Sequence, residues 1–249
     1  MKFIDFFSGV GGFTRGMELA GHECVGHCEI DKWAEASYRS MHTITEAQRE
    51  HLLTLPKSKR VDEILKGEYL NGKWYANDIC RVRPTDVPEA DCYCFGFPCQ
   101  SFSIAGHRRG FEDTRGTLFF EVMRIAKERH PKILFAENVT GLLNHSRGGT
   151  FQTIITTMAE LGYACEWQVL NSRYFGVPQN RERVFIVGHI GTDSKRKVFP
   201  IATDYPKANE LQGHGAIVAN TLKVEGNDTV GTYPIAGGGV LKVNGYHKR

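Results

Sequence analysis

The stretch Phe3-Ile4-Asp5-Phe6-Phe7-Ser8-Gly9-Val10-Gly11-Gly12-Phe13 joins an apolar run to a helical pattern through a cluster of glycines. We predict a strand over Lys2–Phe7 and a helix over Gly12–Ala20. Glycine allows a tight turn between them and lets a ligand come close to the backbone. The ligand would lie at the carboxyl end of the strand, near the N-terminus of the helix. A purely structural turn would give the same pattern, and the spacing differs from the G-x-G-x-x-G of dinucleotide-binding enzymes.

The same alternation of short apolar runs and helical patterns continues along the chain. Strands are predicted at Glu23–Glu29, Asp91–Phe95, Ile133–Glu137, Tyr163–Asn171 and Arg183–His189, and helices at Lys32–Met41, Leu118–Arg129 and Phe151–Leu161. Because strands that alternate with helices form crossover units, this order predicts an α/β fold of the Rossmann-like type. We expect a mostly parallel sheet with helices on both faces.

Two segments depart from this alternation. Residues 42–73 are polar and lack clear periodicity apart from a short helical pattern near Val61–Lys66, so we interpret them as an insertion. After Gly191, the residues Gly, Asn and Thr become frequent and no long helix is predicted. The sequence therefore divides into a main domain over residues 1–190 and a small β-rich or loop-rich appendage over residues 191–249.

Composition and charge exclude some classes of protein. The 249 residues are 41% hydrophobic and 24% charged, and no run approaches the roughly 20 apolar residues needed to cross a bilayer. The N-terminus lacks the pattern of a signal peptide, so we expect a soluble cytoplasmic protein. Residues 191–249 hold eight Lys/Arg against five Asp/Glu, which accounts for the whole net charge of +3. A basic appendage is compatible with contacts to phosphates, and equally with an ordinary solvated surface.

The cysteines indicate reduced thiols. There are seven, an odd number, without a C-x-x-C ladder, in a chain without a signal peptide. Cys92 and Cys94 lie in an apolar run, where we expect them to be in the core. Cys24 and Cys28 have histidines nearby, but their spacing fits no common zinc pattern, and we predict no metal site.

An acidic residue near the glycine turn favours the interpretation that the turn binds a ligand similar to a nucleotide. Glu29 ends the second predicted strand, about 20 residues beyond the turn, where a carboxylate can bind ribose hydroxyls. A solvated carboxylate is the alternative. Ile30 could pack on an adenine face, and Asp78 and Ile79, after a third short strand, could bind the adenine amino group and cover the ring. The glycine spacing favours S-adenosylmethionine over a cofactor that contains a pyrophosphate.

The block Gly96-Phe97-Pro98-Cys99-Gln100-Ser101-Phe102-Ser103 follows the predicted strand Asp91–Phe95. This strand delivers Cys99 to the same sheet edge as the glycine turn, and Pro98 stiffens the approach because its ring fixes φ. A thiol at a strand end in a polar loop is a candidate nucleophile, although most free cysteines are buried packing residues.

Four motifs occur in order along the chain. They are the Phe-Ser-Gly-x-Gly-Gly turn, the Gly-Phe-Pro-Cys-Gln-Ser-Phe-Ser block, Glu137-Asn138-Val139 and Gln179-Asn180-Arg181-Glu182-Arg183. Together they resemble the C5-cytosine DNA methyltransferases of bacteria and phages, and the resemblance covers residues 1–190. It implies that S-adenosylmethionine is the cofactor and that double-stranded DNA is the substrate.

The resemblance implies a role for each motif. Attack of the Cys99 thiolate on C6 of cytosine would make C5 able to accept a methyl group. Glu137 would contact N3 and the exocyclic amine, and Arg183 would bind O2, with Arg181 as its partner on the same face of a strand. A strand-end surface acid and a salt-bridged face are the alternatives for these side chains. The predicted cofactor contacts are Phe7, Ser8, Gly9, Gly11, Gly12, Glu29, Ile30, Asp78, Ile79, Pro98 and Leu118.

A basic segment punctuated by glycines, residues 105–116, resembles the family loop that closes over the extruded base. Its basic side chains would meet phosphates or fill the duplex. The predicted DNA contacts are Gln100, Ser103, His107, Arg108, Arg109 and Arg115. A solvated surface loop is the alternative.

The sequence departs from the family pattern after this body. It shows neither the Arg/Leu/Pro-rich block nor the last helix with Gly-Asn, and Gly213–Tyr246 resembles a short or partial target-recognition region. The chain would then be truncated, or a degenerate relative, or one part of a split enzyme whose second polypeptide supplies the missing helix. We expect the chain alone to be weakly active or inactive.

Three other functions are alternatives to this one. A tRNA cytosine methyltransferase resembles this body but carries a Cys-Phe-Thr signature that this sequence lacks. A non-catalytic DNA-binding subunit would be expected to lack Cys99, Glu137 or Arg183, and all three are present. The glycine spacing and the Pro-Cys block argue against a nicotinamide oxidoreductase.

Overall fold

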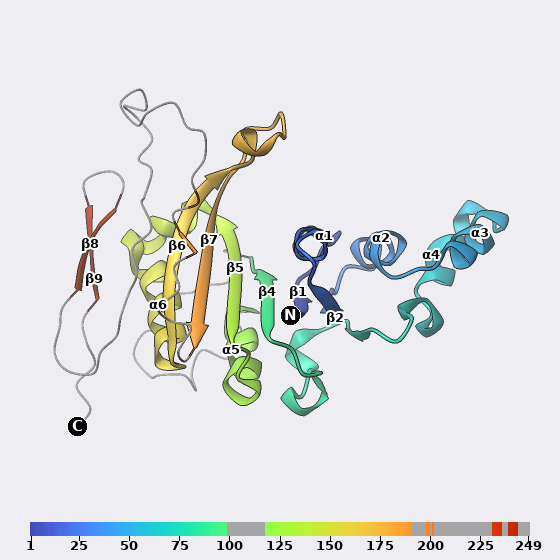
Figure 1. Ribbon diagram of the computed structural model, residues 1–249, viewed down its shortest axis with the longest axis horizontal. Helices are drawn as coiled ribbons and strands as arrows, with labels where there is room; N and C mark the ends of the chain where they lie inside the picture. The colour runs from blue at the N-terminus through green and yellow to red at the C-terminus, as the bar shows by residue number, and fades with distance from the viewer. Residues whose placement is uncertain (99–117, 191–197, 200, 202–230, 236–238, 244–249) are drawn as a thin grey trace. The chain divides into compact units, whose positions relative to one another are not determined.

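The computed structural model describes residues 1–98, 118–190, 198–199, 201, 231–235 and 239–243 (Figure 1). The described residues fall into two compact units. The first contains residues 1–97 and 118–131, and the second contains Pro98 and the described residues from Lys132 onward. The predicted cofactor residues other than Pro98 lie in the first unit, and Glu137, Arg181 and Arg183 lie in the second.

The first unit is built on a parallel sheet with the strand order β3-β2-β1-β4. Its strands are β1 (Lys2–Phe6), β2 (Glu23–Cys28), β3 (Trp74–Ala76) and β4 (Cys92–Gly96). Phe6 lies opposite both Cys28 and Phe95, and Cys28 lies opposite Ala76. Because these partners are close to the last residue of each strand, the four carboxyl ends meet along one edge of the sheet.

Helices cover both faces of this sheet, as predicted. The helices are α1 (Gly12–Leu19), α2 (Lys32–His42) and α5 (Leu118–Arg129). On one face, Thr14 of α1 bonds to Asp5 of β1, and Tyr38 of α2 stacks on His27 of β2 with ring centroids 3.9 Å apart. On the other face, Phe119 of α5 packs against Phe95 of β4 at 6.4 Å.

The segment 42–73, predicted to be an irregular insertion with one short helix, is more helical than its composition suggested. It forms α3 (Glu46–Thr54), α4 (Lys57–Ile64) and the 3-10 helix η1 (Gly67–Leu70). Thr45 and Gln48 form a reciprocal capping box at the start of α3. Buried side chains of Ala36, Leu52, Ile64 and Tyr69 form a small core with α2. The capping box was the sequence signal for α3 that the prediction missed.

The two cysteines predicted to be in the core are there. Cys92 and Cys94 are 1% and 0% exposed on β4, with sulfur atoms 3.8 Å apart. Cys24 and Cys28 are also buried, both on β2. In the part of the chain that the structure describes, no group of His, Cys, Asp and Glu side chains is arranged to hold a metal ion.

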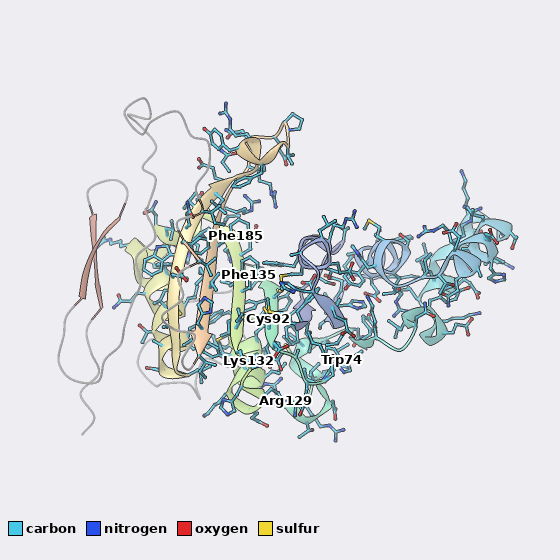
Figure 2. All side chains as sticks on the ribbon, in the orientation of Figure 1. Trp74, Cys92, Arg129, Lys132, Phe135 and Phe185 are labelled. Atoms are coloured by element: carbon cyan, nitrogen blue, oxygen red, sulfur yellow. The ribbon has the colours of Figure 1, made fainter. Side chains whose placement is uncertain are left out.

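The second unit contains an antiparallel sheet with the strand order β5-β7-β6. The strands are β5 (Ile133–Val139), β6 (Tyr163–Asn171) and β7 (Glu182–Ile190), and the helix is α6 (Gly149–Glu160). Phe135 of β5 and Phe185 of β7, labelled in Figure 2, lie side by side with ring centroids 6.0 Å apart. The register of this sheet brings residue 183, at the start of β7, beside the end of β5.

The segment after Gly191 is described in part. Glu166 of β6 accepts hydrogen bonds from the backbone amides of Val198 (2.8 Å) and Phe199 (3.1 Å), which fixes this short stretch to the sheet. Farther on, β8 (Gly231–Ile235) and β9 (Gly239–Val243) form an antiparallel hairpin, consistent with a β-rich appendage. Among the described helices of the whole chain, none is long and apolar enough to span a membrane.

Candidate functional site

The glycine turn after β1 is a tight loop with several left-handed residues. Phe7, Gly9 and Gly11 have φ values of 57°, 54° and 89°. The amide of Ser8 donates to the carbonyl of Cys28 (3.1 Å), and the amide of Gly11 donates to the carbonyl of Ser8 (2.8 Å). A Cβ atom at position 11 would collide with the His42 ring, so this position requires glycine for space as well as for its backbone conformation.

Glu29 closes this turn from the next strand. One oxygen of its carboxylate accepts from the amide of Gly9 and the other from the amide of Asp31, each at 2.8 Å. A carboxylate has about four acceptor positions, so two remain for further donors. The partly buried carboxylate is thus held in place and can still accept two hydroxyl groups, such as those of a ribose.

The residues predicted to hold an adenine ring differ in exposure. Ile30 is 75% exposed and presents an apolar surface next to Glu29. Asp78 caps the 3-10 helix η2 (Ile79–Arg81) by accepting from the amide of Cys80 at 3.0 Å, and it pairs with Arg81 at 3.3 Å. Ile79 is only 2% exposed. Its side chain belongs to the protein interior, so in this structure only its backbone could meet an adenine ring.

Asp5 of β1 holds the helix that follows the glycine turn. It is fully buried on β1, and one carboxyl oxygen accepts from the amide (3.1 Å) and the hydroxyl (2.8 Å) of Thr14. These bonds tie the first turn of α1 to the strand. Burial raises the pKa of Asp5 to about 7, in opposition to the two Thr14 hydrogen bonds, which lower it.

Asp5 should make the stability of the chain depend on pH. Between about pH 4 and pH 7 the folded chain binds one more proton than the unfolded chain, because the pKa of Asp5 is 3.8 in the unfolded state and about 7 in the fold. The free energy of unfolding should therefore fall as the pH rises through this window, by up to roughly 4 kcal/mol, and level off above it.

Asp5→Asn keeps an acceptor for Thr14 but cannot ionise, so it should flatten this part of the stability curve. Denaturant unfolding of both proteins at a series of pH values measures the difference. A variant whose curve runs parallel to that of the wild type would show that Asp5 does not titrate in this range.

Two further predicted cofactor residues flank the segment that contains Cys99. Pro98 follows β4 and is exposed, and Leu118 is the first residue of α5 and half-buried. The predicted nucleophile Cys99 lies outside the described residues, as do the predicted DNA contacts Gln100, Ser103, His107, Arg108, Arg109 and Arg115.

The second unit brings Glu137 and Arg183 together. Arg183 at the start of β7 lies opposite Val139, two residues beyond Glu137 on β5, so the two side chains project from the same face. The Arg183 Nε donates to the Glu137 Oε1 at 2.8 Å. Their side chains are 20% and 24% exposed, which leaves part of each group open to a ligand. The pair offers a carboxyl group beside a planar set of N–H donors.

Arg181 does not share this arrangement. It lies just before β7, not within the strand, and its side chain is exposed. Both arginines were predicted to lie on one strand; in the structure β7 begins at Glu182, one residue after Arg181. Its position is set by its backbone, which accepts from the amide of Ser172 at 3.0 Å and donates to Asn171.

Asn171 is a residue of this site that the sequence did not single out. It is 4% exposed at the end of β6. Its side-chain oxygen accepts from the amides of Arg173 and Arg181, both at 3.2 Å, and its side-chain nitrogen donates to Asn180 at 2.6 Å. A buried amide with three partners fixes the entry to β7 and therefore the start of the strand that carries Arg183. A polar residue at the end of an apolar strand was its only signal.

Comparison with known proteins identifies relatives of this chain. The family model for "C-5 cytosine-specific DNA methylase" matches residues 1–68 and 50–229. The chain is 39% identical over 187 residues to the type II methyltransferase M.HhaI of Haemophilus parahaemolyticus, a match that covers 75% of this chain and 48% of that protein. It is 41% identical over 189 residues to M.HpaII of Haemophilus parainfluenzae, covering 75% and 45%.

A phage protein and a solved structure complete the comparison. The orphan methyltransferase M.SPRI of Bacillus phage SPR is 39% identical over 190 residues, which cover 76% of this chain and 37% of that protein. The crystal structure of the Dnmt2 methyltransferase of S. pombe shares the fold, with a TM-score of 0.57 and 16% identity, over 85% of this chain and 58% of that one. The chain thus spans about half the length, or less, of the curated relatives named here. It belongs to the family of C-5 cytosine-specific DNA methylases.

Proposed function

We propose that this chain carries the catalytic residues of an enzyme that transfers a methyl group from S-adenosylmethionine to C5 of cytosine in double-stranded DNA. The observation that carries the proposal is the Glu137–Arg183 pair, with 2.8 Å between Nε and Oε1. A carboxyl group on β5 and a guanidinium on the neighbouring β7 project from one face of the sheet, and they match the N3–amine edge and the O2 atom of cytosine. Family membership and the four motifs support the same activity.

The first unit fits the cofactor. The Glu29 carboxylate, held by Gly9 and Asp31, retains acceptor positions for the two ribose hydroxyls. Ile30 offers an exposed apolar side chain for the adenine ring, and Asp78 a carboxylate for its amino group. When bound, S-adenosylmethionine supplies an electrophilic methyl group on a sulfonium centre. None of these contacts would require a buried side chain to leave the core. Ile79 is buried, so only its backbone would contact the ring.

Cys99 supplies the nucleophile in this mechanism. Its thiolate forms a bond to C6 of the cytosine, and the electron pair displaced from the C5–C6 double bond makes C5 nucleophilic. Glu137 hydrogen-bonds N3 and the exocyclic amine and gives N3 a proton during the attack, while Arg183 holds O2. After C5 takes the methyl group, a base removes the C5 proton, the double bond re-forms, the C6–S bond breaks to return the thiolate, and the N3 proton goes back to Glu137.

The target base must leave the helix to reach these groups. We propose that residues 105–116 close over the extruded cytosine and that Gln100, Ser103, His107, Arg108, Arg109 and Arg115 contact the DNA. We further propose that residues 1–190 bind the cofactor and the base, with residues 42–73 as an insertion, and that residues 191–249 read the target sequence. The reaction would take place in the cytoplasm of a bacterial or phage-infected cell. A second polypeptide would complete the enzyme.

A product analysis tests the proposed function. The purified chain is incubated with S-adenosylmethionine carrying a labelled methyl group and with duplex DNA that contains cytosine in varied contexts, and the digested nucleosides are separated. Label in 5-methylcytosine is the expected result, at the low rate expected of the chain alone. Label in N4-methylcytosine would contradict the proposed chemistry, and label only in tRNA offered in parallel would replace the proposed substrate with RNA.

A further inference from the structure

Every polar group of Glu29 has a hydrogen-bond partner. Its amide donates to the carbonyl of Ala76 at 3.2 Å, and its two carboxylate oxygens accept from Gly9 and Asp31. Its carbonyl accepts from the hydroxyl of Tyr75 at 3.2 Å. The Tyr75 bond is the one contact in this set that comes from a side chain. The position of Glu29 therefore depends on where β3 and the Tyr75 ring are held.

The Tyr75 ring is held by a buried cation. The Arg39 guanidinium carbon lies 4.9 Å from the centre of the ring, a cation–π distance, and His27 lies against the ring at 5.2 Å. Arg39 is 1% exposed and His27 is 0% exposed. Burial raises the pKa of Tyr75 to about 12, so its hydroxyl keeps its proton and remains a donor at neutral pH.

Arg39 is fixed in turn by the helical segment beyond α2. Its Nη1 donates to the carbonyls of Ile64 (3.1 Å), the last residue of α4, and Lys66 (2.9 Å), two residues beyond it. A cation there satisfies the Ile64 carbonyl in the last turn of the helix and interacts favourably with the helix dipole, while the Lys66 carbonyl also accepts from the amide of Tyr69 at 3.1 Å. Its Nε donates to Glu35, whose other oxygen lies 2.8 Å from the His27 Nε2. A continuous set of contacts thus leads from the end of α4 through Arg39 and Tyr75 to Glu29.

The burial of three charged or titratable side chains in this network, Arg39, Glu35 and His27, costs free energy. A buried ion pair contributes little net stability, and apolar residues of the same volume often replace such a pair without loss. Packing alone would therefore not require Arg39, Glu35 and His27 here. Their directional hydrogen bonds fix the orientation of the Tyr75 ring and its hydroxyl, which apolar packing cannot do.

We propose that Tyr75 and Arg39 are positioning residues for the cofactor, and that the helical segment 42–73 acts through them to set the Glu29 carboxylate. This inference rests on the proposed function, because it assigns Glu29 to the ribose of S-adenosylmethionine. It gives the segment a role in cofactor binding that its position between β2 and β3 would not by itself suggest.

Tyr75→Phe is the direct test, because it removes one hydroxyl and keeps the ring against Arg39. In the full chain, the Kd for S-adenosylmethionine should rise about 3- to 10-fold, the value of one hydrogen bond to a backbone carbonyl. In turnover, KM for S-adenosylmethionine should rise by the same factor with kcat unchanged, since the lost interaction is made equally in the ground state and the transition state.

Tyr69→Phe is the matched control. Tyr69 is buried in the same segment and its hydroxyl donates to Glu63 at 3.3 Å, away from Glu29 and Tyr75. It should lose a comparable amount of stability and leave the Kd for S-adenosylmethionine unchanged. If both variants bind the cofactor as the wild type does, or if both weaken binding equally, the positioning role is wrong. A wild-type chain that binds no S-adenosylmethionine would overturn the proposed function, and the inference with it.

Arg39→Lys tests the second residue. Lysine keeps the positive charge beside Glu35, but its ammonium lacks the planar fork that reaches Glu35 and both carbonyls at once. We expect a several-fold higher Kd for S-adenosylmethionine with unchanged kcat at saturation. A variant that is less stable yet binds the cofactor with wild-type affinity would show that Arg39 only supports the fold.

Discussion

Replacement of Cys99 by serine should abolish methyl transfer, with kcat reduced by at least about 10³-fold, and leave cofactor binding intact. A serine hydroxyl is scarcely ionised at neutral pH and is a much poorer nucleophile than a thiolate, so attack on C6 should fail. Removal of a covalent nucleophile has effects of this size or larger in other enzymes. Methyl transfer to duplex DNA and the Kd for S-adenosylmethionine measure the two parts of the prediction.

Cys80→Ser is the matched control for this variant. Its thiol is exposed and has no assigned role in the reaction. It should methylate DNA at the wild-type rate. A Cys99→Ser variant that turns over within a few-fold of the Cys80→Ser control would show that the reaction does not pass through an adduct with Cys99.

The second large effect is expected for Glu137→Gln, which should lower kcat by about 10²- to 10⁴-fold, the usual contribution of a general acid. Glutamine has nearly the same shape and can still accept a hydrogen bond from Arg183. It cannot give N3 a proton. The effect should therefore appear in the rate of methyl transfer at saturating DNA and cofactor, with little change in the Kd for S-adenosylmethionine, whose predicted contacts lie mainly in the other unit.

Glu160→Gln makes the same chemical change at an exposed position of α6, and should have no effect on the rate. Single-turnover methylation of all three proteins separates the chemical step from product release. A rate for Glu137→Gln within about threefold of this control would show that N3 receives its proton elsewhere.

Local patterns were enough to predict most of the regular elements. The helix over residues 118–129 and the strand over residues 163–171 have the bounds that were predicted, and β1 and β2 differ by one residue at the end. Each of these elements has a clear apolar period and is bounded by glycine, proline or a capping residue. The glycine turn was also predicted from local sequence, since glycine permits the positive φ that Gly9 and Gly11 adopt.

Features that depend on long-range contacts were not predicted. The cluster that makes residues 42–73 fold around Leu52, Ile64 and Tyr69 joins short segments whose own periodicity is weak. The burial of Ile79 and the exposure of Arg181 depend on which neighbours pack beside them, and a motif gives the order of residues but not their surroundings. The bond from Tyr75 to the Glu29 carbonyl joins residues 46 positions apart, and no local pattern marks it.

The central claim is that Cys99 forms a covalent bond to C6 of cytosine before the methyl group is transferred to C5. The most direct measurement uses the purified chain, S-adenosylmethionine and a duplex that contains 5-fluorocytosine. Fluorine at C5 cannot leave as a proton does, so the final elimination is blocked. We predict a complex of protein and DNA that survives denaturation, requires S-adenosylmethionine, and is absent with Cys99→Ser. Methylation of ordinary cytosine by the same preparation without any trapped complex on the fluorinated duplex would contradict the account.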